Sequence, residues 1–254
     1  LMMKGYIDAY RVFEDKEFLK LALKNANFIL KEIKKEDGRL DRNFKNGTST
    51  INGFLDDYAF TIEAFVELYQ ATFDEKWLFE AQELTEYTIT HFLDDKSGMF
   101  FYTSDVDPAL IARKMEVSDN VIPSSNSTMA KNLFKLGHYF YKDSYVKMSR
   151  NMLSNVKEQA LGSGAYFANW ASLMAYFSND VYDVAILGND FEAKRKEIDR
   201  HYLPNVFLSG GKKEGRLEML ELKLVPGSTT IYVCQNKSCK QPVNDTESAL
   251  KQLK

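Results

Sequence analysis

Residues 15–33 read DKEFLKLALKNANFILKEI, and this stretch decides the fold class. Its apolar residues return every three or four positions, which is the spacing of one face of an α-helix. Similar apolar stripes follow through the first 180 residues, so the pattern predicts a succession of amphipathic helices. The later stripes cover residues 58–69, 77–88, 129–140, 145–156 and 170–177.

Short interruptions between these helices resemble one another. An aromatic residue, an aliphatic residue and then a small residue follow each acidic break at Asp15, Asp74 and Asp143. The breaks recur at intervals of about 60 to 70 residues, and an acidic residue there is typical of a helix N-cap. The pattern predicts an array of α-helical hairpins. Chance similarity between helix starts is the alternative interpretation.

Long loops are expected between the hairpins, at residues 35–53 and 93–124, where Gly, Asp, Asn and Ser are frequent. After Asn179 the pattern changes to short apolar runs, which predicts a small α/β region. We therefore expect an α-hairpin part at 1–179 and an α/β region at 180–254. Its predicted strands are 181–187, 206–208, 217–224 and 229–234, with a helix near 246–253.

Charge and composition exclude several classes of partner. Thirty-three basic and 36 acidic residues leave a net charge of −3, and no basic run could neutralise a row of phosphates, so we expect no nucleic-acid partner. No apolar run reaches the ~20 residues that span a membrane, and no secretory signal is visible, which favours a cytoplasmic protein. The chain starts at Leu-Met-Met, so upstream sequence is expected to be missing.

Cys234 and Cys239 are the only cysteines, and the chain has three histidines. The pair cannot by itself supply four zinc ligands, so no metal and no cofactor is predicted. A disulfide between them would need a turn, because an extended segment would hold the sulfurs too far apart. We expect two reduced structural thiols, with redox chemistry as the minority interpretation.

Residues 51–59 read INGFLDDYA and form the first candidate site. Asp56 and Asp57 are adjacent in the opening turn of a predicted helix, so at most one of them faces a pocket squarely. One carboxylate could act as an acid, a base or an acceptor for a sugar hydroxyl, with Phe54 or Tyr58 as a stacking surface. Helix capping is the alternative explanation for both aspartates.

Residues 116–127 read EVSDNVIPSSNS and form the second candidate site. Pro123 and the serines are typical of a helix start. The segment nevertheless carries more hydrogen-bonding groups than a cap requires, which leaves binding and capping as equal alternatives. The candidates are Glu116 and Asp119 as carboxylates and Ser125, Asn126 and Ser127 as ligand-binding groups.

Two carboxylates from separate loops meet the requirement of glycoside hydrolysis, in which one protonates the leaving oxygen and the other activates water or attacks carbon. We select Asp57 and Glu116 for these roles, with Asp119 as a third catalytic candidate. The aromatic run at 100–102 is expected to be either a stacking surface or a short core strand. No G-x-S-x-G elbow occurs, so a serine hydrolase is not favoured.

Four ordered motifs resemble the YyaL type of thioredoxin-domain-containing protein, a group that includes spermatogenesis-associated homologues of animals. The resemblance extends over essentially the whole chain. The motifs are GFLDDYAF at 53–60, LYQATFD at 68–74 followed by Trp77-Leu78, ExxDxxxPSxNS at 116–127, and YVCQN at 232–236 followed by Cys239 and Pro242-Val243.

This resemblance implies a thioredoxin-like domain, absent from this chain, followed by a mainly α, α/α-hairpin toroid of the six-hairpin glycosidase-like kind. The toroid is then expected to be incomplete here and to form a homodimer through an exposed apolar helix face. Related epimerases use histidine bases, and no histidine lies in the motifs. The resemblance thus implies a carbohydrate-binding or carbohydrate-processing protein, glycosidase-like or epimerase-like, with a non-catalytic scaffold as the alternative.

Overall fold

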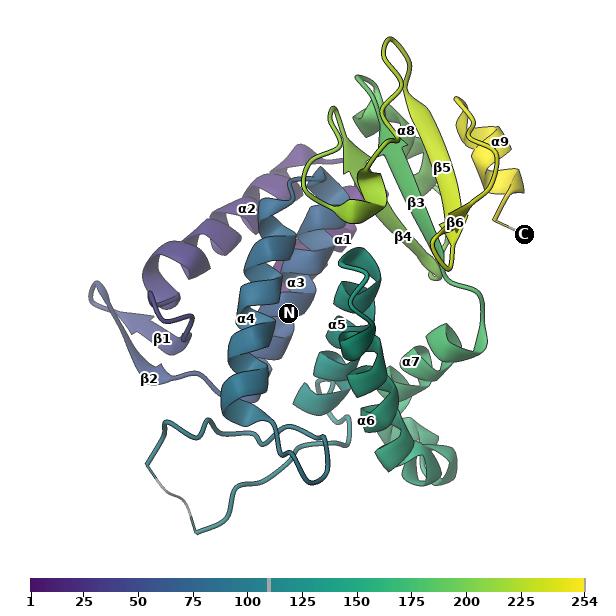
Figure 1. Ribbon diagram of the computed structural model, residues 1–254. Helices are drawn as coiled ribbons and strands as arrows, with labels where there is room; N and C mark the ends of the chain where they lie inside the picture. Colours follow the sequence, from purple (N-terminus) through teal and green to yellow (C-terminus); the bar gives the residue numbers. More distant parts are fainter. Residues whose placement is uncertain (109–110, 254) are drawn as a thin grey trace.

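The computed structural model describes residues 1–108 and 111–253. Helical hairpins form most of the molecule, and a small mixed sheet lies at one end of them (Figure 1). The helices are α1 Met2–Phe13, α2 Lys16–Phe28, α3 Leu55–Thr72, α4 Lys76–Phe92, α5 Ser125–Tyr139, α6 Asp143–Gly162, α7 Ala168–Ser178, α8 Phe191–Asp199 and α9 Thr246–Lys251. The strands are β1 Asp41–Lys45, β2 Thr48–Asn52, β3 Tyr182–Leu187, β4 Val206–Gly211, β5 Thr230–Gln235 and β6 Ser238–Cys239.

The three short breaks share one backbone device, a single residue in the left-handed region. Glu14, Phe73 and Tyr141 have φ values of 58°, 56° and 50°. A left-handed residue ends a helix and turns the chain back, and the Glu14 N–H accordingly donates to Tyr10 O at 2.8 Å. Asp15 then caps α2 by accepting from the Glu17 N–H at 2.9 Å. The predicted α-hairpins are confirmed.

The hairpins place α1, α3, α5 and α7 side by side as an inner layer, with α2, α4 and α6 outside it. Each of α1, α3 and α5 is followed by an outer helix that runs back, so the inner helices begin at the same end. In the centre, α3 and α5 are the most enclosed, and Tyr58, Phe65 and Tyr69 of α3 are fully buried. None of the helices within the described residues is long and apolar enough to cross a membrane.

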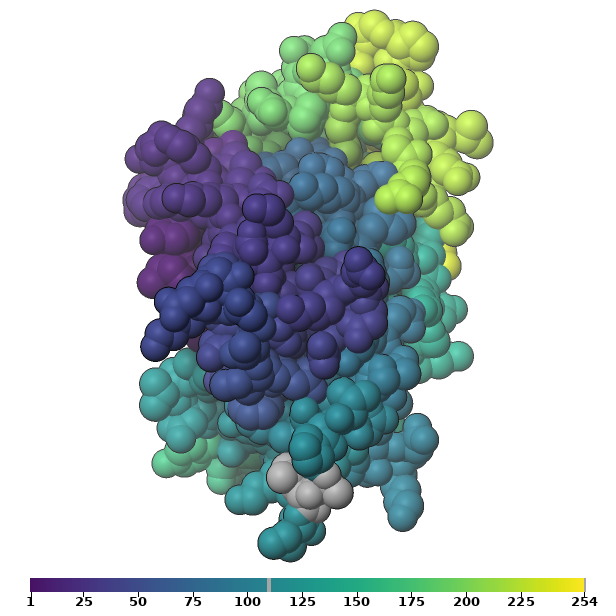
Figure 2. Space-filling model, turned by 90° about the vertical axis from the view of Figure 1, so that its left-hand side faces the viewer, coloured from purple at the N-terminus to yellow at the C-terminus, as the bar shows by residue number. Residues whose placement is uncertain are grey.

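The expected loop at 35–53 contains the antiparallel hairpin β1–β2, which the sequence analysis missed. Its turn is Asn46-Gly47, with φ values of 53° and 78°, and Asn-Gly is a strong signal for such a turn. Figure 2 shows the N-terminal segments, this hairpin included, spread over one face of the molecule. The alternative of a strand at 100–102 was wrong, because Phe100 makes only an isolated bridge to Leu93.

The small sheet has the order β4-β3-β5-β6. β3 and β4 are parallel and joined through α8, whereas β5 pairs antiparallel with both β3 and β6. All six residues of β3 are buried, as expected for a central strand covered on both faces. The predicted strand at 217–224 was wrong, since this segment contains only a 3₁₀ turn, Glu218–Leu220.

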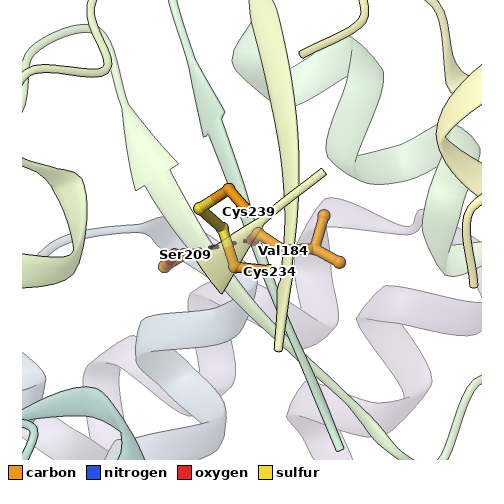
Figure 3. Close-up of a disulfide and its surroundings, with 4 residues drawn as sticks. All are labelled: Val184, Ser209, Cys234 and Cys239. Carbon is orange, nitrogen blue, oxygen red and sulfur yellow. Dashed lines mark hydrogen bonds between the residues drawn. A yellow bond between two sulfur atoms is a disulfide. The ribbon is translucent and has the colours of Figure 1, made fainter. Parts of the chain in front are cut away.

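The cysteines differ from the prediction of two free thiols. Cys234 and Cys239 are joined in a disulfide (Figure 3). They lie directly opposite each other in the β5–β6 hairpin, with Cα atoms 3.8 Å apart. The turn at Asn236 and Lys237, both with positive φ, brings them together. The turn that a disulfide requires is therefore present, and the expectation of two reduced thiols was wrong.

A buried charged network joins the inner helices to the small sheet. Glu67 of α3 accepts hydrogen bonds from Lys135 of α5 and from Gln70 Nε2. Arg11 of α1 bridges Glu67 and Asp199 of α8, at 3.4 and 2.7 Å. The same Gln70 accepts a hydrogen bond from the backbone N–H of β4. Side chains from three inner helices therefore hold the sheet at the end of the array opposite the helix starts.

Candidate functional site

The starts of α3, α5 and α7 follow the three longer connections and lie at the end of the array that carries the 93–124 loop (Figure 1). Helix starts present free backbone N–H groups and the positive end of the helix dipole. Polar side chains from different parts of the sequence meet here. The two candidate motifs, 51–59 and 116–127, lead into the first turns of α3 and α5.

Asp56 and Asp57 share one partner, Arg42 of β1. The Arg42 guanidinium Nη1 lies 3.2 Å from Asp56 Oδ1 and 2.8 Å from Asp57 Oδ2. Asp57 also accepts from the Phe54 backbone N–H at 2.9 Å, which caps α3. Both carboxylates thus have structural contacts, yet both keep some exposure, 15% for the Asp56 side chain and 27% for Asp57.

Two aromatic rings border this carboxylate pair. Phe54 and Tyr102 pack with their centroids 5.0 Å apart, and Arg42 lies over the Phe54 ring at 4.7 Å. The Tyr102 hydroxyl donates to Asp56 at 3.2 Å. We call these five residues, Arg42, Phe54, Asp56, Asp57 and Tyr102, the α3 cluster. It combines carboxylates with partly exposed ring faces.

Two members of the α3 cluster, Asp57 and Tyr102, have raised pKa values. Burial raises the pKa of Asp57, and the Asp56 carboxylate adds to this rise, against the opposing effects of the Phe54 N–H and Arg42. Burial, followed by the charge of Asp56, raises the pKa of Tyr102 to about 12. A carboxyl group with a raised pKa next to a second carboxylate is suited to holding and donating a proton.

Two shallow hollows adjoin Asp57. One, of about 390 Å³, is bordered by Asp56, Asp57 and Ile122, and so reaches the loop that carries the second motif. The other, of about 410 Å³, is bordered by Asp57 and Arg42. Asp57 therefore faces accessible space from both sides, and small ligands have room next to its carboxylate.

Tyr58 lies outside this accessible space. Its ring is fully buried and stacked on Tyr87, with centroids 5.4 Å apart, and its hydroxyl accepts from the Leu40 N–H at 2.8 Å. The side chain that borders the carboxylates instead is Phe54, together with Tyr102. Tyr102 was named only as part of an aromatic run, and Arg42 was missed because nothing local distinguishes an arginine in a loop.

The second motif forms a buried hydrogen-bond network. Asp119, 7% exposed, accepts from the Ser124 N–H at 2.9 Å, the Ser127 hydroxyl at 2.9 Å and the Asn169 N–H at 2.8 Å. It thereby joins the start of α5 to the start of α7. Ser125 is also fully buried. Three donors already occupy Asp119, which leaves it little capacity for a ligand.

Asn126 is likewise held inside the protein. Its amide pairs with the backbone N–H and C=O of Phe100, at 2.8 and 2.9 Å, and also donates to Glu116 O at 3.0 Å. Among the candidate residues of this motif Glu116 is exposed, and its carboxylate lies 3.4 Å from the Ser125 N–H. The motif thus separates into buried groups that connect elements and one accessible carboxylate.

Substituting Asp119 tests whether its carboxylate serves to connect the helices. Asp119→Ala should lower the free energy of unfolding by about 3 kcal/mol, because three donors lose a shared buried acceptor. Urea unfolding measures the change, and the exposed neighbour Ser118→Ala is the matched control, expected to change stability by less than ~0.5 kcal/mol. An Asp119 variant as stable as the control would contradict the structural role.

Comparison with known proteins connects this architecture to a group of relatives. No protein-family model matches the chain. Human spermatogenesis-associated protein 20 is 24% identical over 266 residues, which cover 96% of this chain and 34% of the human protein. The chain is related to spermatogenesis-associated protein 20. Rat spermatogenesis-associated protein 20, 25% identical, matches over the same share of each chain. The chain thus spans about a third of the length of these curated relatives.

Solved structures support the fold. An alpha-mannanase from Bacteroides thetaiotaomicron superposes with a TM-score of 0.56 and 12% identity, over 84% of this chain and 61% of that one. A cellobiose 2-epimerase from Bacillus thermoamylovorans does so with a TM-score of 0.50 and 15% identity, over 60% of this chain and 41% of that one. The expected α/α-hairpin toroid fold of the six-hairpin glycosidase-like kind is confirmed.

Proposed function

We propose that the chain binds a carbohydrate at the α3 cluster and that Asp57 acts on it as a proton donor. The observation that carries this proposal is the pair of partly exposed carboxylates held on one arginine next to two aromatic rings. Sugar rings present an apolar face that packs on aromatic side chains and hydroxyls that bond to carboxylates. The fold shared with a mannanase and an epimerase supports the same class of ligand.

The chemistry assigned to this site divides the work between two carboxylates. Asp57, whose pKa is raised, holds the proton given to a departing or ring oxygen. Glu116, exposed at the neighbouring helix start, is the proposed base or nucleophile. Arg42 and the Tyr102 hydroxyl keep Asp56 in place as a further acceptor for sugar hydroxyls. Metal and cofactor have no role in this proposal.

A second candidate, a non-catalytic scaffold, is favoured by a specific contact. Asp57 completes a capping arrangement with the Phe54 N–H, and Asp119 ties two helices together. Under this alternative the polar groups only hold helices in place. Asp57→Asn distinguishes the two candidates. An asparagine oxygen still accepts the Phe54 N–H, so a scaffold would keep its cap, but the side chain cannot donate an acidic proton, so a catalytic site would lose its acid.

A thermal-shift screen against mono- and oligosaccharides tests the proposal. We expect one sugar class to raise the melting temperature of the native chain and Asp57→Asn to abolish that shift. The free energy of unfolding should change by less than ~1 kcal/mol in the variant, since the cap is retained. Once a binding sugar is identified, its turnover is measured with Asp57→Asn and Glu116→Gln.

The matched control is Asp74→Asn, which removes a carboxylate that caps a helix at a hairpin turn, where Asp74 accepts from the Lys76 N–H at 3.1 Å. This variant should retain the sugar response. A sugar response that survives Asp57→Asn, or no response to any sugar from a folded chain, would favour the scaffold instead.

A further inference from the structure

A separate pocket of about 390 Å³ lies where the helical array meets the small sheet, away from the α3 cluster. The later parts of α5 and α7, the start of α6, β3 and the β5–β6 turn enclose it. Figure 1 shows these elements converging at the end of the array opposite the 93–124 loop. We call it the junction pocket and define it by Phe134, His138, Tyr176, Asp183, Gln235 and Lys237.

Asp183 is the unusual group in the junction pocket. Its side chain is 5% exposed on the central strand β3, and its Oδ1 is buried with no hydrogen-bond partner. The imidazole of His138 faces this carboxyl group, with its Nδ1 3.9 Å from Asp183 Oδ1, beyond hydrogen-bond distance. A buried acceptor without a donor destabilises a protein, so a ligand that supplies a donor at this position would bind more tightly.

Asp183 is the one charged residue of β3. The other five residues of this strand are buried and carry no charge. Burial raises the pKa of Asp183 to about 7 and lowers the pKa of His138 to about 4. The two groups therefore face the pocket as a carboxyl near its titration point and a neutral imidazole at neutral pH.

The walls of the pocket determine the class of ligand. Phe134 and Tyr176 are stacked, with centroids 5.5 Å apart and planes at 9°, and Phe177 packs against Phe134 at 4.8 Å. The amide side chains of Asn179, Gln235 and Asn236 line the opening. Aromatic rings combined with amide, carboxyl and imidazole groups match a ring-shaped ligand that carries several hydroxyls.

The charges that line the pocket disfavour a charged ligand. They include three cations, Lys147, Arg150 and Lys237, and the carboxylates of Asp143 and Asp180. A cationic ligand would meet the three basic groups, and an anionic one would meet Asp143, Asp180 and the Asp183 carboxyl. A neutral hydroxylated ligand avoids both penalties, because a hydroxyl both donates and accepts.

From these observations we infer that the junction pocket is a binding site for an uncharged, polyhydroxylated ring of the monosaccharide class, with Asp183 and His138 bonding its hydroxyls. The site does not depend on the proposed role of the α3 cluster. Its outer wall is the tip of the β5–β6 hairpin, where Lys237 lies over the Tyr141 ring at 4.6 Å. The Cys234–Cys239 disulfide at the base of this hairpin holds that wall in position.

Nuclear magnetic resonance of the histidine rings tests the inference. The chain has three histidines, so His138→Gln identifies the His138 signal directly. The probes are the methyl glycosides of glucose, mannose and galactose, with glucosamine and glucose 6-phosphate as charged comparators. We expect at least one methyl glycoside to shift the His138 signal in a saturable manner and the charged comparators to bind more weakly.

Two variants locate the binding. Asp183→Leu should weaken the response by about tenfold or more, because it removes the buried hydrogen-bonding group without changing the side-chain size greatly. Asp57→Asn should leave the response of His138 unchanged, which distinguishes this pocket from the α3 cluster. A thermal melt verifies that each variant is folded.

Three results would overturn the inference: no shift of His138 with any methyl glycoside, a shift produced only by a charged comparator, or a shift that persists undiminished in folded Asp183→Leu. Loss of the response in Asp57→Asn would place the binding at the α3 cluster and would equally reject the junction pocket.

Discussion

Glu67→Gln is expected to lower the free energy of unfolding by about 3–5 kcal/mol at neutral pH. Glu67 is 5% exposed and lies between Lys135 and Arg11, which are on the two neighbouring inner helices. A neutral glutamine leaves the Lys135 ammonium buried without its anionic partner. Breaking a buried ion pair on one side is far more costly than removing an exposed one.

The pH dependence of stability provides a second measurement for Glu67. Burial alone would raise its pKa, but Lys135, Arg11 and Lys4 outweigh burial and lower the pKa from 4.5 to about 2. A lowered pKa in the folded state means that the contribution is complete above pH 4.5 and is lost as the pH falls toward 2. The glutamine variant should lack this acid-dependent loss.

Glu63→Gln is the matched control, one helical turn earlier on α3. Glu63 lies 4.0 Å from Lys131, and its side chain is 12% exposed, so the pair is longer and less buried. We expect it to change the free energy of unfolding by about 1 kcal/mol or less. Urea unfolding of both variants across pH makes the comparison. Equal effects at Glu67 and Glu63 would show that the network does not hold the helices together.

Asp183→Asn is expected to act in the opposite direction and to raise the free energy of unfolding by about 2–4 kcal/mol above neutral pH. Burial raises the pKa of Asp183 to about 7, and the charge of Lys223 only partly opposes this. Because the unfolded chain ionises near 3.8, native stability should fall as the pH rises from about 4 to 7. Above that range the loss is complete.

Asp183→Asn cannot ionise at this position, so it does not lose stability as the pH rises. Its free energy of unfolding should therefore exceed that of the native chain at pH 8 and nearly equal it at pH 4. Asp190→Asn, which removes an exposed carboxylate close to the same strand, is the control substitution. Thermal melts across pH provide the comparison. If Asp183→Asn were destabilising at pH 8, the carboxylate would have a native partner that the geometry does not contain. A stabilising effect of Asp183→Asn would mean that the native carboxyl group lowers stability, as is common for residues that are retained for binding.

Local patterns in the sequence were sufficient for the helices and their hairpins. The apolar stripes predicted the amphipathic helices, and the acidic breaks at Asp15, Asp74 and Asp143 coincide with the turns that join them. These features depend on neighbours within one or two helical turns, which the sequence displays directly. The Asn46-Gly47 hairpin was equally visible and was overlooked, whereas the strand expected at 217–224 had apolar residues but no neighbouring strand to pair with.

The candidate residues were found from the sequence, but the roles available to them were not. Asp57 and Asp119 look alike as acidic residues at or before helix starts, yet one borders accessible space and the other is enclosed by three donors. Two of these donors come from the start of α5 and the third from α7, so the surroundings of Asp119 are complete only when α7 packs against α5. Arg42, which holds both carboxylates of the α3 cluster, comes from a strand that the sequence analysis did not expect.

By itself, the sequence determined the hairpin array and the relatives to which the chain is similar, because periodicity and motif order are local properties. Tertiary structure alone decided the disulfide, the Glu67 network and the isolation of Asp183. The disulfide and the Glu67 network join residues that strand register and helix packing bring together. The same packing isolates Asp183 on β3. Burial and partner distances set their energies, and neither quantity can be read from residue order.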